Sequence, residues 1–202
     1  MIDEQPITLW FDGKEIEARI SSLTDKLADE KLGQWWQDED LKERFDPEPI
    51  DRRWNVSKLV IEYEGRILAS ERVAVVTGEG EHLAVEGAML ISTEPIESKL
   101  QHGRFCLLLE LLFTAPRNRP DLRLDERSYV TGVGLQLLKW GVRLSREKGC
   151  EGCLRLDASP DSIKWYEKRG LQKLKMESIV HEGAAYTPME LSIKAAERLT
   201  AE

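Results

Sequence analysis

The feature of the sequence that most constrains the fold is an apolar run, residues 105–116, that contains a single carboxylate, Glu110. A run of this kind is typical of a strand that is buried on both faces. A buried carboxylate is costly unless it is paired or neutral, and burial raises its pKa. Glu110 is therefore a candidate general base. The alternatives are an edge glutamate that faces solvent and one paired with a structural arginine.

A glycine-containing segment, residues 129–135, leads into a strongly amphipathic stretch that ends at Gly149. Two glycines, Gly132 and Gly134, open this predicted helix. Backbone N–H groups at a helix N-terminus can bind a phosphate, although a plain turn is the alternative. A dinucleotide fingerprint needs a third glycine where the chain has Leu137, and no Gly-Lys-Ser/Thr of a P-loop follows.

A short strand is predicted over residues 153–159, followed by a helix. Ser159 and Pro160 are a favourable helix start, and Gly170 is a favourable stop. Tyr166 lies within this helix. It can be a core residue or, near a thiolate, a proton donor.

Taken together, residues 105–171 resemble the acetyl-CoA-binding core of the GNAT superfamily of N-acetyltransferases. The family's loop motif, Gln/Arg-x-x-Gly-x-Gly/Ala, is similar to residues 129–134, although Tyr129 stands at the first position. The family's Asn-x-x-Ala-x-x-Phe-Tyr-Glu-Lys-x-Gly-Phe is similar to residues 159–171 at the same spacing.

The resemblance implies a GNAT fold of the α/β (α+β) class, a twisted and mostly antiparallel mixed sheet flanked by helices on both faces. It implies acetyl-CoA as co-substrate, no metal, and direct attack by a primary amine in a ternary complex. Glu110 would be the base, and Tyr166 the acid that protonates the CoA thiolate. The cofactor would contact the end of the apolar strand, the glycine loop and the family's asparagine position: Phe113, Thr114, Ala115, Val130, Thr131, Gly132, Val133, Gly134, Leu135 and Ser159.

The rest of the chain is predicted as flanking structure within one domain, residues 1–202. A hairpin turning at Asp12-Gly13 and a helical arm make up residues 1–57, with a capping box at residues 22–25. Strands are predicted over residues 59–63, 67–69, 73–76 and 83–91, with a loop over residues 93–103. A last hairpin turns at Glu182-Gly183, and residues 194–202 form a short helix or a frayed tail.

The cysteines do not indicate a disulfide framework, because there are only three: Cys106, Cys150 and Cys153. Cys150 and Cys153 have C-x-x-C spacing, which leaves a redox pair or metal site as an alternative interpretation. The segment follows a helix rather than opening one, and His82, His102 and His181 show no metal-ligand spacing.

The net charge of −8, from 29 basic and 37 acidic residues, disfavours a nucleic-acid-binding role. No apolar run approaches the roughly 20 residues that cross a bilayer, so we expect a cytoplasmic protein with no membrane partner. We predict an N-acetyltransferase, with a non-catalytic CoA-binding or regulatory domain as the alternative. The acceptor, a small molecule or a protein, stays open, as do the oligomeric state (a homodimer among the options) and the roles of Trp35, Trp36, His181 and Tyr186.

Overall fold

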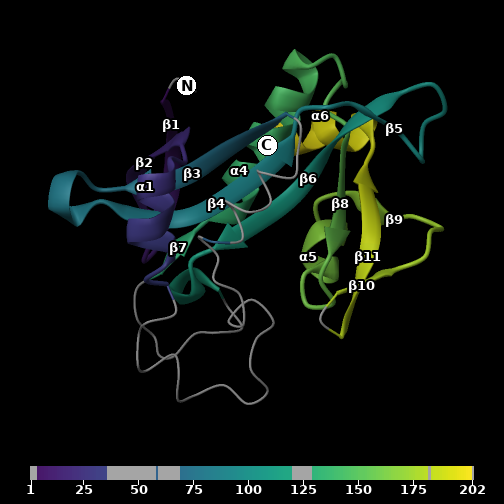
Figure 1. Cartoon of the computed structure of the whole chain (residues 1–202). Coiled ribbons are helices and arrows are strands. Elements are labelled where there is room, and N and C mark those ends of the chain that lie inside the picture. The colour runs from purple at the N-terminus through teal and green to yellow at the C-terminus, as the bar shows by residue number, and fades with distance from the viewer. Residues whose placement is uncertain (1–3, 36–57, 59–68, 120–128, 182, 202) are drawn as a thin grey trace. The chain divides into compact units, whose positions relative to one another are not determined.

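The computed structural model describes residues 4–35, 58, 69–119, 129–181 and 183–201 (Figure 1). They form two compact units. Unit 1 comprises residues 1–90 and 111–137, and unit 2 comprises residues 91–110 and 138–202. The chain passes between the units within two strands, β4 (Ala84–Ser92) and β6 (Phe105–Thr114), and within one helix, α4 (Val133–Glu147).

Unit 1 begins with the predicted hairpin. Its strands β1 (Gln5–Phe11) and β2 (Lys14–Ser22) are antiparallel. Asp12 and Gly13 both have positive φ, as a two-residue turn between twisted strands requires. The unit also contains β3 (Ser70–Thr77), β4 (Ala84–Ser92) up to Leu90, and β7 (Val130–Thr131). Their order is β4-β3-β2-β1-β7, and a 3-10 turn, η3 (Gly80–His82), joins β3 to β4.

The first helix starts later than predicted. Thr24, not Ser22, is the N-cap, because its Oγ1 accepts a hydrogen bond of 3.2 Å from the Leu27 N–H. The helical segment consists of α1 (Asp25–Leu27) followed by the π-helical η1 (Ala28–Leu32). The strand expected over residues 59–63, the first two residues of the strand expected over 67–69, and the arm over residues 36–57 lie outside the described residues.

Helices cover both faces of β4 in unit 1. Ala88 and Leu90 pack in one core cluster with Leu32 of η1. Gly87 points to the opposite face, since successive strand residues alternate. A Cβ at Gly87 would lie 2.5 Å from Cγ1 of Val133 and 2.9 Å from the carbonyl oxygen of Phe113. Only glycine therefore allows α4 to approach the sheet this closely.

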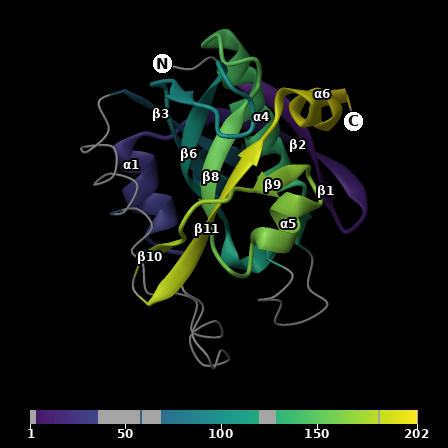
Figure 2. The same ribbon diagram turned by 90° about the vertical axis from the view of Figure 1, so that its right-hand side faces the viewer.

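Unit 2 contains the first six residues of β6 in a sheet with the C-terminal strands. These strands are β8 (Leu154–Ala158), β9 (Leu171–Lys173), β10 (Ile179–His181) and β11 (Ala184–Leu191). β11 lies antiparallel to β8, β9 and β10, and Figure 2 shows β8 and β11 side by side. β6 and β8 are paired in parallel, so the sheet of this unit is mixed.

The helices of unit 2 are the main part of α4, α5 (Ile163–Glu167) and α6 (Ile193–Ala201). α4 ends before Gly149, which has a φ of 78°, so the predicted stop is confirmed. The predicted start of α5 at Pro160 is wrong, since residues 160–162 form turns and the helix begins at Ile163. Of the two alternatives predicted for residues 194–202, the short helix is confirmed, as α6.

Two short elements complete the described chain. The predicted loop over residues 93–103 contains a strand, β5 (Ile96–Glu97), which pairs with β6. A 3-10 turn, η4 (Pro116–Asn118), follows β6. No helix among the described residues has the length and apolar content needed to span a membrane.

Replacement of Gly87 by alanine should lower the free energy of unfolding by about 2 kcal/mol, because the new Cβ overlaps Val133. Urea denaturation measures this. The matched variant Gly87→Ala/Val133→Ala removes the Cγ1 atom nearest to the new methyl group and should recover part of the loss. A Gly87→Ala protein as stable as the wild type would contradict the close packing.

Candidate active site

Strand β6 carries the predicted base and pairs with β8 along only part of its length. It pairs in parallel with β8 through Leu107↔Leu154 and Leu108↔Arg155. Among the described residues no further β6–β8 pair is formed, although β6 continues to Thr114 and β8 to Ala158. The two strands therefore part directly before Glu110.

Glu110 is half-buried on this strand. Burial raises the pKa of its carboxyl group, and the negative charge of Asp157 raises it further. The side chain makes no hydrogen bond or ion pair with another residue of the described chain. A carboxylate with a raised pKa and no fixed partner can accept a proton from a substrate.

Asp157 is a site residue that the sequence did not reveal. It lies on β8 two residues after Arg155, just as Glu110 lies on β6 two residues after Leu108, the partner of Arg155. Strand periodicity therefore places both carboxyl groups on the same face of the sheet. Burial also raises the pKa of Asp157, while Arg155 opposes this rise. Only the register between β6 and β8, which is a tertiary feature, brings the two acids together.

Tyr166 lies on α5 and is buried, with 7% of its surface exposed. Burial raises the pKa of its phenol well above the ordinary value, and Arg169 only partly opposes this. The ring packs edge-on against Trp165, at 5.0 Å between ring centroids. The Arg169 guanidinium stacks over the same indole at 3.8 Å. A phenol in this setting stays protonated at neutral pH, as a proton donor must.

The glycine loop lies at the start of α4 in unit 1. Gly132 has a φ of 92°, a conformation that a residue with a Cβ adopts only with strain. Its carbonyl oxygen accepts a hydrogen bond from the Gln136 N–H at 2.9 Å. The N–H groups of Val133, Gly134 and Leu135 precede the first helical hydrogen bond, so the helix itself supplies no acceptor for them. These amides are the hydrogen-bond donors that could bind a phosphate.

The other predicted cofactor contacts lie at strand ends. In unit 1 the Ala115 N–H donates to the Glu86 carbonyl at 2.8 Å, while Phe113 and Thr114 end β6 half-buried. The Val130 N–H donates to Asn118 Oδ1 at 2.9 Å. Ser159 in unit 2 follows β8, and its hydroxyl donates to Ser162 Oγ at 2.9 Å.

The loop that begins at Tyr129, where the family has Gln or Arg, is held by a residue that precedes it in the chain. Asn118 Oδ1 accepts a hydrogen bond from the N–H of Val130, the residue after Tyr129, and Asn118 Nδ2 donates to Glu86 at 2.6 Å. Arg117, one of four arginines in the long link before the loop, also pairs with Glu86 at 3.0 Å. Arg123 and Arg127 lie outside the described residues.

Trp35 is buried, and its indole N–H donates to the Val85 carbonyl at 3.2 Å. It lines a cavity of about 280 Å³ in unit 1. The charged residues of the cavity wall are cations, Lys31 and Arg117. A wall of this charge does not favour a cationic ligand. Trp36 and the acidic residues after it lie outside the described chain.

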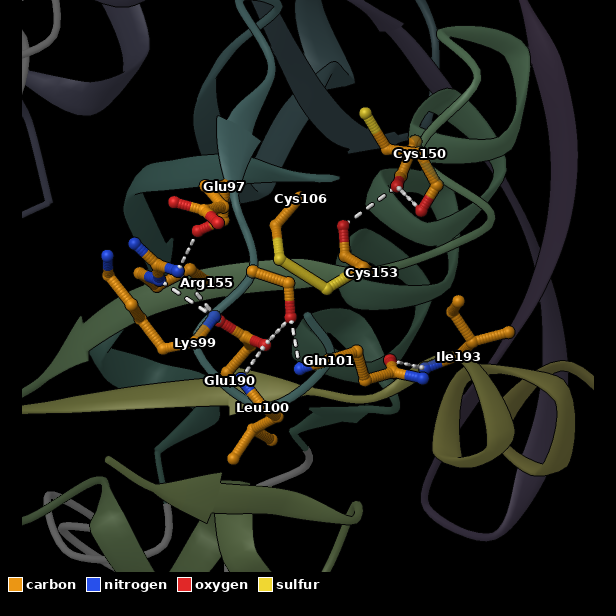
Figure 3. Close-up of a disulfide and its surroundings, with 12 residues drawn as sticks. Glu97, Lys99, Leu100, Gln101, Cys106, Cys150, Cys153, Arg155, Glu190 and Ile193 are labelled. Atoms are coloured by element: carbon orange, nitrogen blue, oxygen red, sulfur yellow. Dashed lines mark hydrogen bonds and ion pairs between the residues drawn. A yellow bond between two sulfur atoms is a disulfide. The ribbon is translucent and has the colours of Figure 1, made fainter. Parts of the chain in front are cut away.

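The cysteines do not follow the C-x-x-C interpretation. Cys106 and Cys153 form a disulfide, with their Cα atoms 4.6 Å apart, and Cys150 is a free, buried thiol (Figure 3). The reason is the strand register: these two cysteines directly precede the paired residues Leu107 and Leu154, so they lie opposite each other. Burial raises the pKa of the Cys150 thiol, which makes it a poor nucleophile.

A metal site at this disulfide is not supported. The Glu190 carboxylate lies within 4.8 Å of both sulfur atoms. Its oxygens, however, already accept hydrogen bonds from Ser98 Oγ, the backbone N–H groups of Lys99 and Leu100, and the Arg155 guanidinium (Figure 3). Burial by itself would raise the pKa of Glu190, but these bonds hold it below the ordinary value. The cluster is a satisfied structural network.

Comparison with known proteins gives the fold. No protein-family model and no characterised protein matches the sequence. A structure described as a bacterial toxin matches with a TM-score of 0.55 and 17% identity, over 92% of this chain and 96% of the other. A chimera of the spermidine N-acetyltransferase SpeG from Vibrio cholerae with hSSAT matches with a TM-score of 0.52 and 12% identity, over 90% and 98%.

A putative acetyltransferase of the GNAT family from Desulfovibrio desulfuricans matches with a TM-score of 0.52 and 16% identity, over 87% of this chain and 98% of the other. The chain therefore has the mixed α/β fold of the GNAT acetyltransferases, and the predicted fold is confirmed.

Reduction of the Cys106–Cys153 bond should lower the free energy of unfolding by about 2–4 kcal/mol, because the bond closes a loop across a sequence separation of 47 residues. Urea denaturation with and without dithiothreitol measures this difference. The Cys106→Ala/Cys153→Ala protein should show no effect of the reductant, whereas Cys150→Ala should keep the full effect. Equal stability of the oxidised and reduced wild type would contradict the bond.

Proposed function

We propose that this chain is an N-acetyltransferase that moves an acetyl group from acetyl-CoA to a primary amine by direct attack. The observation that carries the proposal is the parting of β6 from β8 directly before Glu110, in a chain with the GNAT fold. Pantetheine would add to β6 as an extended strand, along Phe113 to Ala115. The pyrophosphate would bind the N–H groups at the start of α4, around Gly132 and Gly134.

Glu110 acts as the general base in this proposal. An alkylammonium ion has a pKa of about 10.4 and no lone pair, so it must lose a proton before it attacks the thioester. The raised pKa of Glu110 makes it a stronger base, and the charge of Asp157 attracts the cationic acceptor. The amine nitrogen bonds to the acetyl carbon, the carbon–sulfur bond breaks, and the thiolate receives the proton of Tyr166. The nitrogen then gives up its second proton to form the neutral amide, and that proton restores the phenol.

The acceptor class that best suits this arrangement is a cationic amine. Two carboxyl groups lie on one face beside the proposed reaction centre, and the net charge of the chain is −8. A non-catalytic CoA-binding domain is the alternative function. It would need the loop around Gly132 but neither Glu110 nor Tyr166.

The test of the proposal is incubation of the chain with acetyl-CoA and a panel of primary amines, with detection of free CoA thiol. Thiol release that depends on an amine supports acetyl transfer. CoA binding without release, for every amine, supports the non-catalytic alternative. Gly132→Glu places a carboxylate in the phosphate site and should abolish both binding and release, which makes it the negative control.

Glu110→Gln should lower kcat/KM for the amine by about 100-fold or more near neutral pH, because the base is lost. The loss should shrink toward pH 10, where the amine is already neutral. Asp157→Asn is the matched variant: it removes a charge that raises the pKa of Glu110, so the acidic limb of its pH profile should move to lower pH. A constant ratio of wild type to Glu110→Gln across pH would contradict a base role.

Tyr166→Phe should lower kcat by about 100-fold while the Kd for acetyl-CoA changes less than about twofold, because only the proton donor is removed. Trp165→Phe, which alters the ring packed against Tyr166, is the control for packing and should retain most of kcat. Wild-type turnover in Tyr166→Phe would assign the residue to the core.

A further inference from the structure

A buried amide–carboxylate pair lies behind the glycine loop of unit 1. Asn118 and Glu86 are 8% and 3% exposed. Asn118 Nδ2 donates to Glu86 Oε2 at 2.6 Å, and Asn118 Oδ1 accepts from the Val130 N–H at 2.9 Å. One side chain thus joins strand β4 to the first residue of β7, through both of its polar atoms.

Glu86 is held in place from three directions. Thr77 Oγ1 donates to its Oε1 at 2.8 Å, and Arg117 Nη2 donates to its Oε2 at 3.0 Å, beside the bond from Asn118. A buried carboxylate with these partners has a fixed orientation, because rotation would leave donors and a charge unpaired. Asn118 is therefore also fixed, and the amide plane cannot flip without breaking both of its bonds.

The position of Val130 determines where the loop begins. Val130 is the first residue of β7, Gly132 follows two residues later, and α4 starts at Val133. On the other side, β7 pairs with Trp10 and Phe11 of β1. The loop is thus held by the sheet on one side and by Asn118 on the other. The amides from Val133 to Leu135 precede the first helical hydrogen bond, which Gln136 donates to Gly132, so the helix supplies no acceptor for them.

We propose that Asn118, fixed by Glu86, is the positioning residue of the CoA-binding loop and sets the affinity of the chain for the pyrophosphate of CoA. Asn118 does not touch the cofactor. It orients the backbone donors before binding, so that no ordering is required when the anion arrives. The proposal rests on the proposed function and explains how a loop with Tyr129 at its first position is held.

The first test is Asn118→Ala, assayed by calorimetry with CoA and by steady-state kinetics. We expect the Kd for CoA and the KM for acetyl-CoA to rise about tenfold, which corresponds to about 1.4 kcal/mol. We expect kcat and the KM for the amine to stay within about twofold of the wild type. Unchanged Kd and KM for the cofactor would overturn the proposal, and so would an equal loss confined to kcat.

A charge swap tests the pairing itself. Asn118→Asp keeps the acceptor for Val130 but places a second carboxylate against Glu86, so CoA binding should weaken at least as much as in Asn118→Ala. The double variant Glu86→Gln/Asn118→Asp restores a donor opposite an acceptor, since the amide introduced on β4 would donate to the new carboxylate. That carboxylate also gives Arg117 an anionic partner in place of Glu86. Its Kd should return to within about threefold of the wild type. A double variant as weak as Asn118→Asp would overturn the assignment.

Thr77→Val is the matched control. It removes one buried hydrogen bond from the other oxygen of Glu86 and leaves both bonds of Asn118 intact. It should lower stability while the Kd for CoA rises clearly less than in Asn118→Ala, because Arg117 and Asn118 still hold Glu86. A Kd that rises as much as in Asn118→Ala would reduce Asn118 to a structural residue and overturn the proposal. If Asn118→Ala does not fold, the swap and Thr77→Val decide the question.

Failure of the proposed function gives a different result. A wild-type chain that binds no CoA overturns the function, and with it the proposal. A wild-type chain that binds CoA and an Asn118→Ala chain that binds it equally well overturn the positioning role alone.

Discussion

The proposed chemistry depends on the point along β6 at which its pairing with β8 ends. This strand pairs with β8 through Leu107 and Leu108 and continues for six residues after that pairing ends. The N–H and C=O groups of an unpaired strand edge must be satisfied by water or by an added strand. In the proposed function, pantetheine would add to β6 as an extended strand after this point. Glu110 follows the last paired residue by two positions and so lies where the pairing with β8 has ended.

Such a parting requires that the strands be held firmly where they still pair. In unit 2 the Cys106–Cys153 bond lies directly before the paired residues, and the Arg155–Glu190 ion pair joins β8 to β11 at 2.8 Å. Arg155 also donates to the Glu97 carbonyl, which ties in β5. The covalent bond and the buried charges confine the separation of β6 from β8 to the residues after Leu108.

Local signals in the sequence predicted most of the described elements. The hairpin at Asp12-Gly13 and α4 with its stop at Gly149 are specified by turn chemistry and by apolar periodicity, which act within a few residues. The predicted starts of two helices were wrong, at positions where more than one polar residue can serve as the N-cap. Ser22 and Thr24 are both adequate caps, and Thr24 is the one whose hydroxyl accepts the Leu27 N–H. Ser159 bonds to Ser162 in a turn, which delays the start of α5. The disulfide and the Glu110–Asp157 pair depend on strand register, which no local pattern contains.

The buried carboxylates show most clearly what the sequence could not supply. Glu86, Glu110 and Glu190 all lie in apolar strands, and the sequence singled out Glu110, although the other two are more deeply buried. What distinguishes them is their partners. Glu86 and Glu190 accept hydrogen bonds from segments far away in the chain, which stabilise the charge and fix the side chain. Glu110 has no such donor among the described residues, so burial raises its pKa and the charge of Asp157 raises it further, whereas the hydrogen bonds to Glu190 hold the pKa of that residue below its ordinary value. The set of partners, more than burial, separates a structural carboxylate from one that is available to react.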